Sequence, residues 1–187
     1  MKKREQNKAN SINRICTGFF ELLQQRELNE ISMTDISNQI GMKRSTVYGY
    51  FGSVKEISDY LIDLNNKYCE NFINEHFDFL RNGEFITELH VKEALTPLIR
   101  KIAEQPSHYF LIEKLDFTYL PILDIMRELF NKIVEQNNPQ IPYINYFQYS
   151  CKYAIYGVIL TWIKNGAVDS PEDIVEVITR NLFCKFY

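Results

Sequence analysis

The chain of 187 residues is 45 % hydrophobic and 24 % charged, a composition typical of a soluble globular protein with one large or two small domains. Its formal net charge of −3 does not by itself indicate a nucleic-acid partner. The charge is unevenly distributed, however. Residues 1–55 carry nine Lys and Arg against five Asp and Glu, whereas residues 56–187 carry twelve against nineteen. This asymmetry favours a DNA-reading N-terminal domain joined to a domain that does not touch DNA.

Helical periodicity predicts an all-α protein. The chain contains only seven glycines and six prolines, no proline precedes Pro97, and no alternating strand pattern is visible. We expect about nine helices from the apolar spacing and the helix start and stop signals. They are predicted at residues 10–26, 34–40, 43–49, 53–81, 85–104, 107–117, 121–136, 143–165 and 171–184.

The first residues admit two interpretations. Lys2, Lys3 and Arg4 form either a solubilising disordered tail or a basic arm that lies along DNA phosphates. We expect a tail that is mobile in the free protein and contacts phosphates in the bound one. The first predicted helix then has one apolar face, made by Ile12, Cys16, Phe19 and Phe20.

Residues 32–51, SMTDISNQIGMKRSTVYGYF, are the most informative stretch. Ser32 is placed to N-cap a helix, Asp35 completes a capping-box-like pair, and Gly41 suits the positive φ at the end of that helix. A second short helix follows, and its basic, hydroxyl-bearing and phenolic side chains can bond phosphate oxygens and base edges. Two short helices joined by a glycine-containing turn are typical of a helix-turn-helix, although many helical hairpins are only scaffolding.

From Ile12 to Ile57 the chain resembles the N-terminal domain of the TetR family of transcriptional regulators. The segment NEISMTDISNQIGMKRSTVYGYF is similar to the family's pattern of Thr-x-x-x-Ile followed by Gly-Val-x-x-x-Thr-x-Tyr-x-x-Phe. The resemblance implies a helix-turn-helix DNA-binding domain at residues 1–52 and a helical ligand-binding and dimerisation domain at residues 53–187. The residues expected to contact DNA are Ser32, Thr34, Lys43, Arg44, Ser45, Thr46, Tyr48, Tyr50 and Lys55.

The sequence departs from the family pattern at three places. The lysine that family members carry three residues after the closing Phe51 comes one position later, at Lys55. Gly49 and Tyr50 stand where members often carry a larger or basic residue and a histidine. These differences alter the expected phosphate contacts and leave the DNA-binding role intact in outline.

The middle of the chain is rich in aromatic residues. Most of them are expected to form a packed core, and an apolar effector pocket between helices is the alternative for some. In the TetR family the effector pocket lies in this region, and Tyr109, Glu113 and Tyr119 are candidates to offer polar groups to a small apolar effector.

The last two predicted helices carry apolar stripes at spacings of three and four residues. Such helices either complete the core or pair with a second copy of the chain. The segment YAIYGVILTWIKNGAVDSPEDIVEVI resembles the C-terminal part of a TetR-like subgroup that includes a dihydroxyacetone-kinase regulator. The resemblance implies homodimerisation as a four-helix bundle through Ile155, Val158, Trp162, Ile174 and Ile178.

Nothing in the sequence indicates catalysis. There is no Ser/His/Asp arrangement, carboxylate pair or Gly-rich phosphate loop, so we expect neither an enzyme nor a cofactor. The four cysteines and three histidines lack metal-ligand spacing, so no metal site is predicted. No signal peptide or membrane-spanning run is visible, which predicts a cytoplasmic protein with no membrane association.

The sequence therefore predicts a TetR-like homodimer that binds a palindromic operator in double-stranded DNA. Repression that is released by a small-molecule effector is the expected mode. The alternative is a co-regulator that acts through a protein partner without binding DNA on its own.

Overall fold

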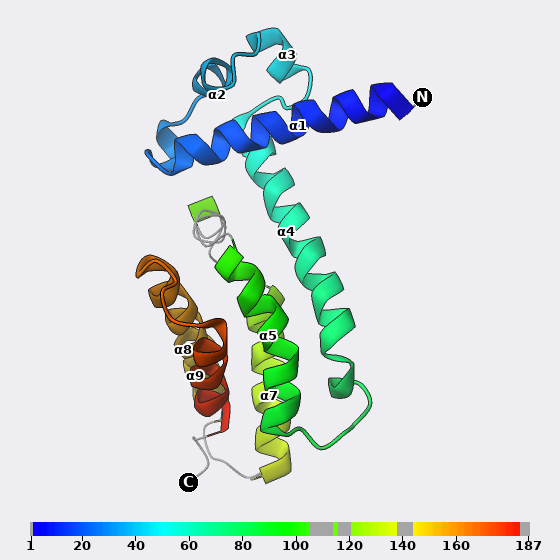
Figure 1. The fold of residues 1–187 in the computed structure, drawn as a ribbon, viewed down its shortest axis with the longest axis vertical. Helices are drawn as coiled ribbons and strands as arrows, with labels where there is room; N and C mark the ends of the chain where they lie inside the picture. The colour runs from blue at the N-terminus through cyan, green and yellow to red at the C-terminus, as the bar shows by residue number, and fades with distance from the viewer. Residues whose placement is uncertain (1, 105–113, 116–120, 138–143, 184–187) are drawn as a thin grey trace. The chain divides into compact units, whose positions relative to one another are not determined.

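The computed structural model describes residues 2–104, 114–115, 121–137 and 144–183. Within these ranges the chain forms eight α-helices and two short 3-10 helices, without a β-strand (Figure 1). The α-helices are α1 (Lys2–Leu23), α2 (Met33–Gln39), α3 (Arg44–Tyr48), α4 (Val54–His76), α5 (Glu88–Glu104), α7 (Pro121–Asn137), α8 (Ile144–Lys164) and α9 (Pro171–Phe183). The predicted all-α class is confirmed. No described helix combines the length and the apolar character that crossing a bilayer requires.

The chain divides into two compact units. Unit 1 consists of Met1–Asn65 and Leu111–Phe117, and unit 2 consists of Asn66–Phe110 and Thr118–Tyr187. The division therefore falls inside α4, whereas the sequence suggested a domain boundary between residues 52 and 53. Helix α4 itself is continuous across this division.

Unit 1 has its own hydrophobic core. Apolar side chains of the first four α-helices meet there with no exposed surface, because each helix turns one apolar face inward. The fully buried members are Ile15, Phe19, Leu23, Ile36, Val47 and Ile57.

The first helix begins earlier than its apolar pattern predicts. We expected a helix from about residue 10 behind a mobile tail, but α1 starts at Lys2. Residues 2–9 contain neither glycine nor proline, and most of them are good helix formers, so the helix extends beyond the part that packs on the core.

The fourth helix ends earlier than predicted. We expected it to continue to about residue 81, but it stops at His76 and a 3-10 turn, Asp78–Leu80, follows. Phe77, Phe79 and Leu80 are all buried, at 1 %, 8 % and 2 % exposure. Successive residues of an α-helix point about 100° apart, so an unbroken helix could not turn all three side chains inward.

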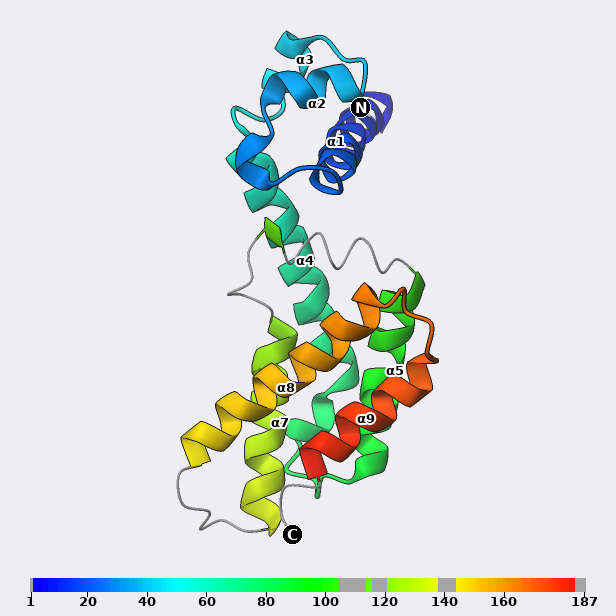
Figure 2. The same ribbon diagram turned by 90° about the vertical axis from the view of Figure 1, so that its left-hand side faces the viewer.

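Unit 2 is a helical bundle. Helix α5 packs against α9, and α7 and α9 both pack against α8 (Figure 2). Its core includes the fully buried Val91, Ile99, Leu129, Ile133, Cys151, Ile178 and Leu182. Of the helix predicted at residues 107–117, only Lys114 and Leu115 lie within the described residues.

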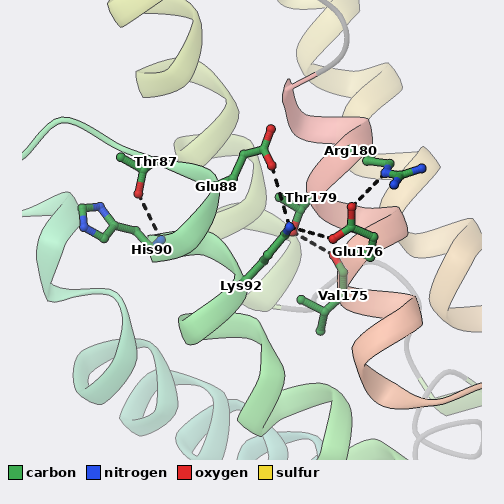
Figure 3. Close-up of polar contacts among 8 residues, drawn as sticks. All are labelled: Thr87, Glu88, His90, Lys92, Val175, Glu176, Thr179 and Arg180. Atoms are coloured by element: carbon green, nitrogen blue, oxygen red, sulfur yellow. Dashed lines mark hydrogen bonds and ion pairs between the residues drawn. The ribbon is translucent and has the colours of Figure 1, made fainter.

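Charged groups also join α5 to α9. Figure 3 shows Lys92 of α5 between two carboxylates: its Nζ lies 2.6 Å from Glu176 of α9 and 3.7 Å from Glu88 of its own helix. Arg180 binds the same Glu176 at 2.8 Å. A second link joins Arg100 of α5 to Glu172 of α9 at 2.7 Å. These pairs are partly exposed, so each adds little stability alone, but together they fix how α9 lies along α5.

The cysteines at positions 16 and 69 are small core residues. Burial raises the pKa of the Cys16 thiol and that of the Cys69 thiol to about 11. Both thiols are therefore protonated and poorly nucleophilic near neutral pH.

Candidate nucleic-acid interface

Helix α2 starts and ends at residues that fix its boundaries. The Ser32 hydroxyl accepts a hydrogen bond from the Asp35 amide at 3.2 Å, and the Asp35 carboxylate accepts one from the Ser32 amide at 2.9 Å. This reciprocal capping box confirms the predicted helix start, and hydrogen bonds that the Ser32 hydroxyl and then its amide donate to the carboxylate hold the pKa of Asp35 below its ordinary value. At the other end Gly41 has a φ of +61°, which a residue with a side chain rarely adopts.

The turn between α2 and α3 is closed by two reciprocal hydrogen bonds. The hydroxyl of Ser37 donates to the carbonyl of Met42 at 2.6 Å, and the amide of Met42 donates to the carbonyl of Ser37 at 3.1 Å. Ser37 is only 5 % exposed, so these bonds are shielded from water. The turn therefore has one well-defined shape, and with it the direction in which α3 leaves α2 is set (Figure 1).

Helix α3 buries one side chain and exposes the others. Val47 has no exposed surface and anchors the helix to the core of unit 1. The predicted contact residues around it are all exposed: Lys43, Arg44, Ser45, Thr46 and Tyr48. Tyr50 is half-buried and packs against the same core, so less of its side chain is available to a ligand.

The exposed surface of this region is cationic. From residue 41 to residue 55 the chain contains Lys43, Arg44 and Lys55 but no carboxylate. A short helix with hydroxyls and cations on its outer face suits the phosphates and base edges of a DNA groove.

Lys55 and Ser32, both predicted contacts, are engaged by carboxylates of the protein itself. The Nζ of Lys55 lies 2.8 and 2.9 Å from the two carboxylate oxygens of Asp59, one turn further along α4. The hydroxyl and amide of Ser32 are both used by Asp35 in the capping box, whereas the side chain of Thr34 is exposed. Lys55 must therefore exchange its partner, or share it, to reach a phosphate.

The predicted dimerisation residues lie mostly inside unit 2. Ile155, Trp162, Ile174 and Ile178 are between 0 and 7 % exposed within a single chain, and Val158 is half-buried. The indole Nε1 of Trp162 donates to the carbonyl of Asp169 at 3.1 Å, so this side chain also fixes the turn before α9. These four residues are buried in the core of one chain, but Trp162 and Ile174 also line an open groove beside α9, so their role in dimerisation stays a prediction.

A different face of α8 is exposed. Tyr146, Tyr149 and Tyr153 are 77 %, 56 % and 55 % exposed, at spacings of three and four residues. Further along the same helix there is an open groove of about 460 Å³ beside α9, lined by Ala154, Gly157, Val158, Thr161, Trp162, Asn165, Asp169 and Ile174. Sequence reasoning missed this face because tyrosine serves equally well in a core.

The residues predicted to line an effector pocket, Tyr109, Glu113 and Tyr119, lie outside the described residues. Among those described, unit 2 contains an open cavity of about 490 Å³ between α4, α7 and α8. It is lined by Ile73, Asp124, Ile125, Arg127, Glu128, Asn131 and Gln148. The lining is mainly polar, and charged residues on α7 gave no sequence signal because they resemble a solvated helix face. No group of three or more His, Cys, Asp or Glu in the described ranges is arranged to hold a metal ion.

Comparison with known proteins links this architecture to gene regulation. Residues 117–183 match a TetR-type family model described as a transcriptional regulator C-terminal region. The fold is similar to that of the fatty acid degradation regulator FadR from Bacillus halodurans, with a TM-score of 0.57 and 14 % identity over 92 % of this chain and 94 % of that one. It is also similar to the dihydroxyacetone kinase operon activator DhaS, with a TM-score of 0.50 and 19 % identity over 94 % of this chain and 95 % of that one. No curated protein matches the sequence significantly.

An N-terminal helix-turn-helix followed by a helical bundle is the fold that this chain shares with both solved proteins. The C-terminal region thus resembles the TetR family of transcriptional regulators, and the likeness to the two solved structures is a likeness of fold. The family resemblance predicted from the sequence is confirmed.

Proposed function

We propose that the chain binds a two-fold-symmetric DNA operator as a homodimer and represses transcription until a small molecule releases it. The observation that carries the proposal is the outer face of α3, where Lys43, Arg44 and Tyr48 are exposed around the buried anchor Val47. In this proposal α3 enters the major groove. Arg44 pairs with guanine O6 and N7, and Lys43, Ser45 and Thr46 share base and phosphate contacts.

Phosphate contacts surround this helix. Tyr48, Tyr50, Thr34 and Lys55 are assigned to phosphates, which position the helix without reading sequence. Lys55 can reach a phosphate only if its ion pair with Asp59 breaks, so we assign Lys55 a smaller share of the binding affinity. Ser32 is assigned the structural task of capping α2.

We assign the dimer contact to the exposed face of α8. A two-fold interface brings the same patch of both subunits together, so protruding and recessed parts of that patch must complement each other. On α8, exposed tyrosines precede an open groove whose lining includes Ala154 and Gly157, and an antiparallel partner helix would place Tyr149 and Tyr153 of one copy near Gly157 of the other. Dimerisation doubles the operator and supplies most of the useful affinity, because one helix-turn-helix reads only a few base pairs.

The effector is assigned to unit 2. The cavity between α4, α7 and α8 includes Ile73 on α4, and α4 is continuous with the DNA-binding unit. A ligand that displaced α4 would change the separation of two recognition helices, which must lie about 34 Å apart to meet successive major grooves. The polar lining differs from the apolar pocket that we expected and favours a ligand with hydrogen-bonding groups.

A second candidate function is a co-regulator that acts through a protein partner. The pairing of Lys55 with Asp59 and the missing side chain at Gly49 both reduce the surface offered to phosphates, and these observations favour it.

A gel shift with purified protein and a palindromic duplex separates the two candidates. Autonomous, saturable binding supports the regulator proposal. Binding that appears only after a cell extract is added supports the co-regulator and overturns autonomous recognition.

A further inference from the structure

Two residues of α1 contact the end of α2. The guanidinium Nη2 of Arg14 donates a hydrogen bond of 2.8 Å to the carbonyl of Ile40. One turn further along α1, a Cβ placed on Gly18 would lie 2.1 Å from Cγ2 of the same Ile40, well inside van der Waals contact. Arg14 and Gly18 therefore hold one residue of α2 by its carbonyl and by its side chain.

Ile40 occupies a position that controls α3. It is the C-cap of α2 and directly precedes Gly41, the residue with positive φ. Helix carbonyls at this end have no partner within the helix, so a donor from outside both satisfies the carbonyl and fixes the cap. Any rotation at Ile40 is passed to the turn and changes the direction of α3.

We propose that Arg14 and Gly18 are positioning residues for DNA recognition: they set the direction of α3 through Ile40 without contacting DNA. The inference rests on the proposed function, because it concerns how the recognition helix is aimed. A third contact ties the same helices together, since the side-chain amide Nε2 of Gln39 donates to the carboxylate of Glu21 at 2.7 Å.

The competing role for Arg14 is a phosphate contact, because its side chain is exposed and cationic. The two roles differ in what they do to binding. A phosphate contact adds affinity for every sequence and contributes to the salt dependence. A positioning residue affects mainly the affinity for the preferred sequence, because base contacts require α3 to be correctly oriented and non-specific phosphate contacts do not.

The first experiment compares Arg14→Met with Lys55→Met, a variant of an assigned phosphate contact. Each is titrated with a selected operator and with an unrelated duplex at several salt concentrations. For Arg14→Met we expect a loss of roughly tenfold for the operator, as for a lost hydrogen bond to a charged group. We also expect a loss of less than about twofold for the unrelated duplex, and no change in the salt slope. Equal losses on both duplexes with a shallower slope would make Arg14 a phosphate contact and overturn the inference.

The second experiment tests the close approach at Gly18. Gly18→Ala should weaken operator binding, because Ile40 has to move away from the new methyl group. Ile40→Ala removes the Cγ2 that the methyl would meet, so Gly18→Ala combined with Ile40→Ala should bind the operator better than Gly18→Ala alone. Ile40→Ala by itself is the control. Thermal unfolding of each variant distinguishes a loss of folded protein from a change in the orientation of α3.

The outcomes remain distinguishable from failure of the proposed function. If the wild type binds no duplex, the proposed function fails and the positioning role fails with it. If the wild type binds an operator and the folded Arg14→Met and Gly18→Ala variants bind it equally well, only the positioning role is overturned.

Discussion

The guanidinium of Arg44 lies over the ring of Tyr48, with its central carbon 5.3 Å from the ring centroid and its Nη2 3.2 Å from the Tyr48 hydroxyl. The two residues are one turn apart on α3 and both are exposed. A cation–π contact combined with a hydrogen bond limits the rotamers of an otherwise mobile arginine. Tyr48 therefore restrains the guanidinium of Arg44 on the face that we assign to DNA.

Replacing Arg44 with alanine should weaken operator binding by about 1–3 kcal/mol and relax the preference at one base pair of each half-site. Tyr48→Phe keeps the ring and loses the hydroxyl, so we expect a smaller loss with the base preference retained. Competition with single-base operator variants measures both effects. Equal loss of affinity for every sequence would place Arg44 on a phosphate instead.

Releasing Lys55 from its carboxylate partner should strengthen DNA binding. Asp59→Asn removes the charge that lies 2.8 Å from the Lys55 ammonium and adds no bulk. We expect tighter binding to all duplexes and a salt slope steeper by about one for each subunit that gains a phosphate contact. Asp63→Asn, one turn further along α4, is the matched control for the change in net charge. The same gain in both variants would show that only overall charge matters.

Substitutions on the two faces of α8 should have different effects. Tyr153→Asp places a carboxylate on an exposed face, so the chain should fold normally and sediment as a monomer. Trp162 is 3 % exposed, and Trp162→Asp should unfold unit 2, because an unpaired buried carboxylate costs several kcal/mol. Sedimentation and thermal unfolding of both variants check the assignment. A folded Tyr153→Asp variant that stays dimeric would remove the tyrosine face from the interface.

Acid should loosen α9 from α5. Hydrogen bonds from Lys92 and from Arg180 hold the pKa of Glu176 below the ordinary value of 4.5. A carboxyl with a depressed pKa in the folded state stabilises the fold above its unfolded pKa, and this contribution is lost as the pH falls through the folded value. Stability against urea should therefore fall below about pH 4.5, and less steeply in Glu176→Gln than in the wild type. Glu135→Gln, which alters an exposed carboxylate of α7, is the control and should show the same pH dependence of stability as the wild type. A pH dependence of Glu176→Gln identical to that of the wild type would contradict the assignment.

Local signals made much of the fold predictable. The capping box of Ser32, the glycine at position 41 and the Ser170 cap before Pro171 act over three or four residues, so the sequence displays them directly. The start of α1 was predicted too late because the prediction relied on apolar spacing. Residues 2–9 are mainly polar and have no such spacing.

Contacts between distant residues could not be predicted in the same way. Arg14 and Ile40 are 26 residues apart, and nothing in either segment indicates that they meet. On α8, Ile155 and Trp162 point into the core while Tyr149 and Tyr153 are exposed. Both sets lie at helical spacing, so periodicity predicted a helix with more than one apolar face. It did not indicate which of these faces packs against the rest of the same chain.

The most direct test of the account is selection of bound sequences from a pool of random duplexes by the purified protein, followed by titration of the selected duplex at several salt concentrations. We predict a palindromic consensus and a log K against log[salt] slope of roughly −5 to −8, because we assign Lys43, Arg44, Lys55 and part of the basic stretch Lys2–Arg4 to DNA in each subunit. Deletion of residues 1–8 should flatten the slope and leave the consensus unchanged. Failure to enrich any sequence, or binding that does not depend on salt, would contradict autonomous DNA recognition.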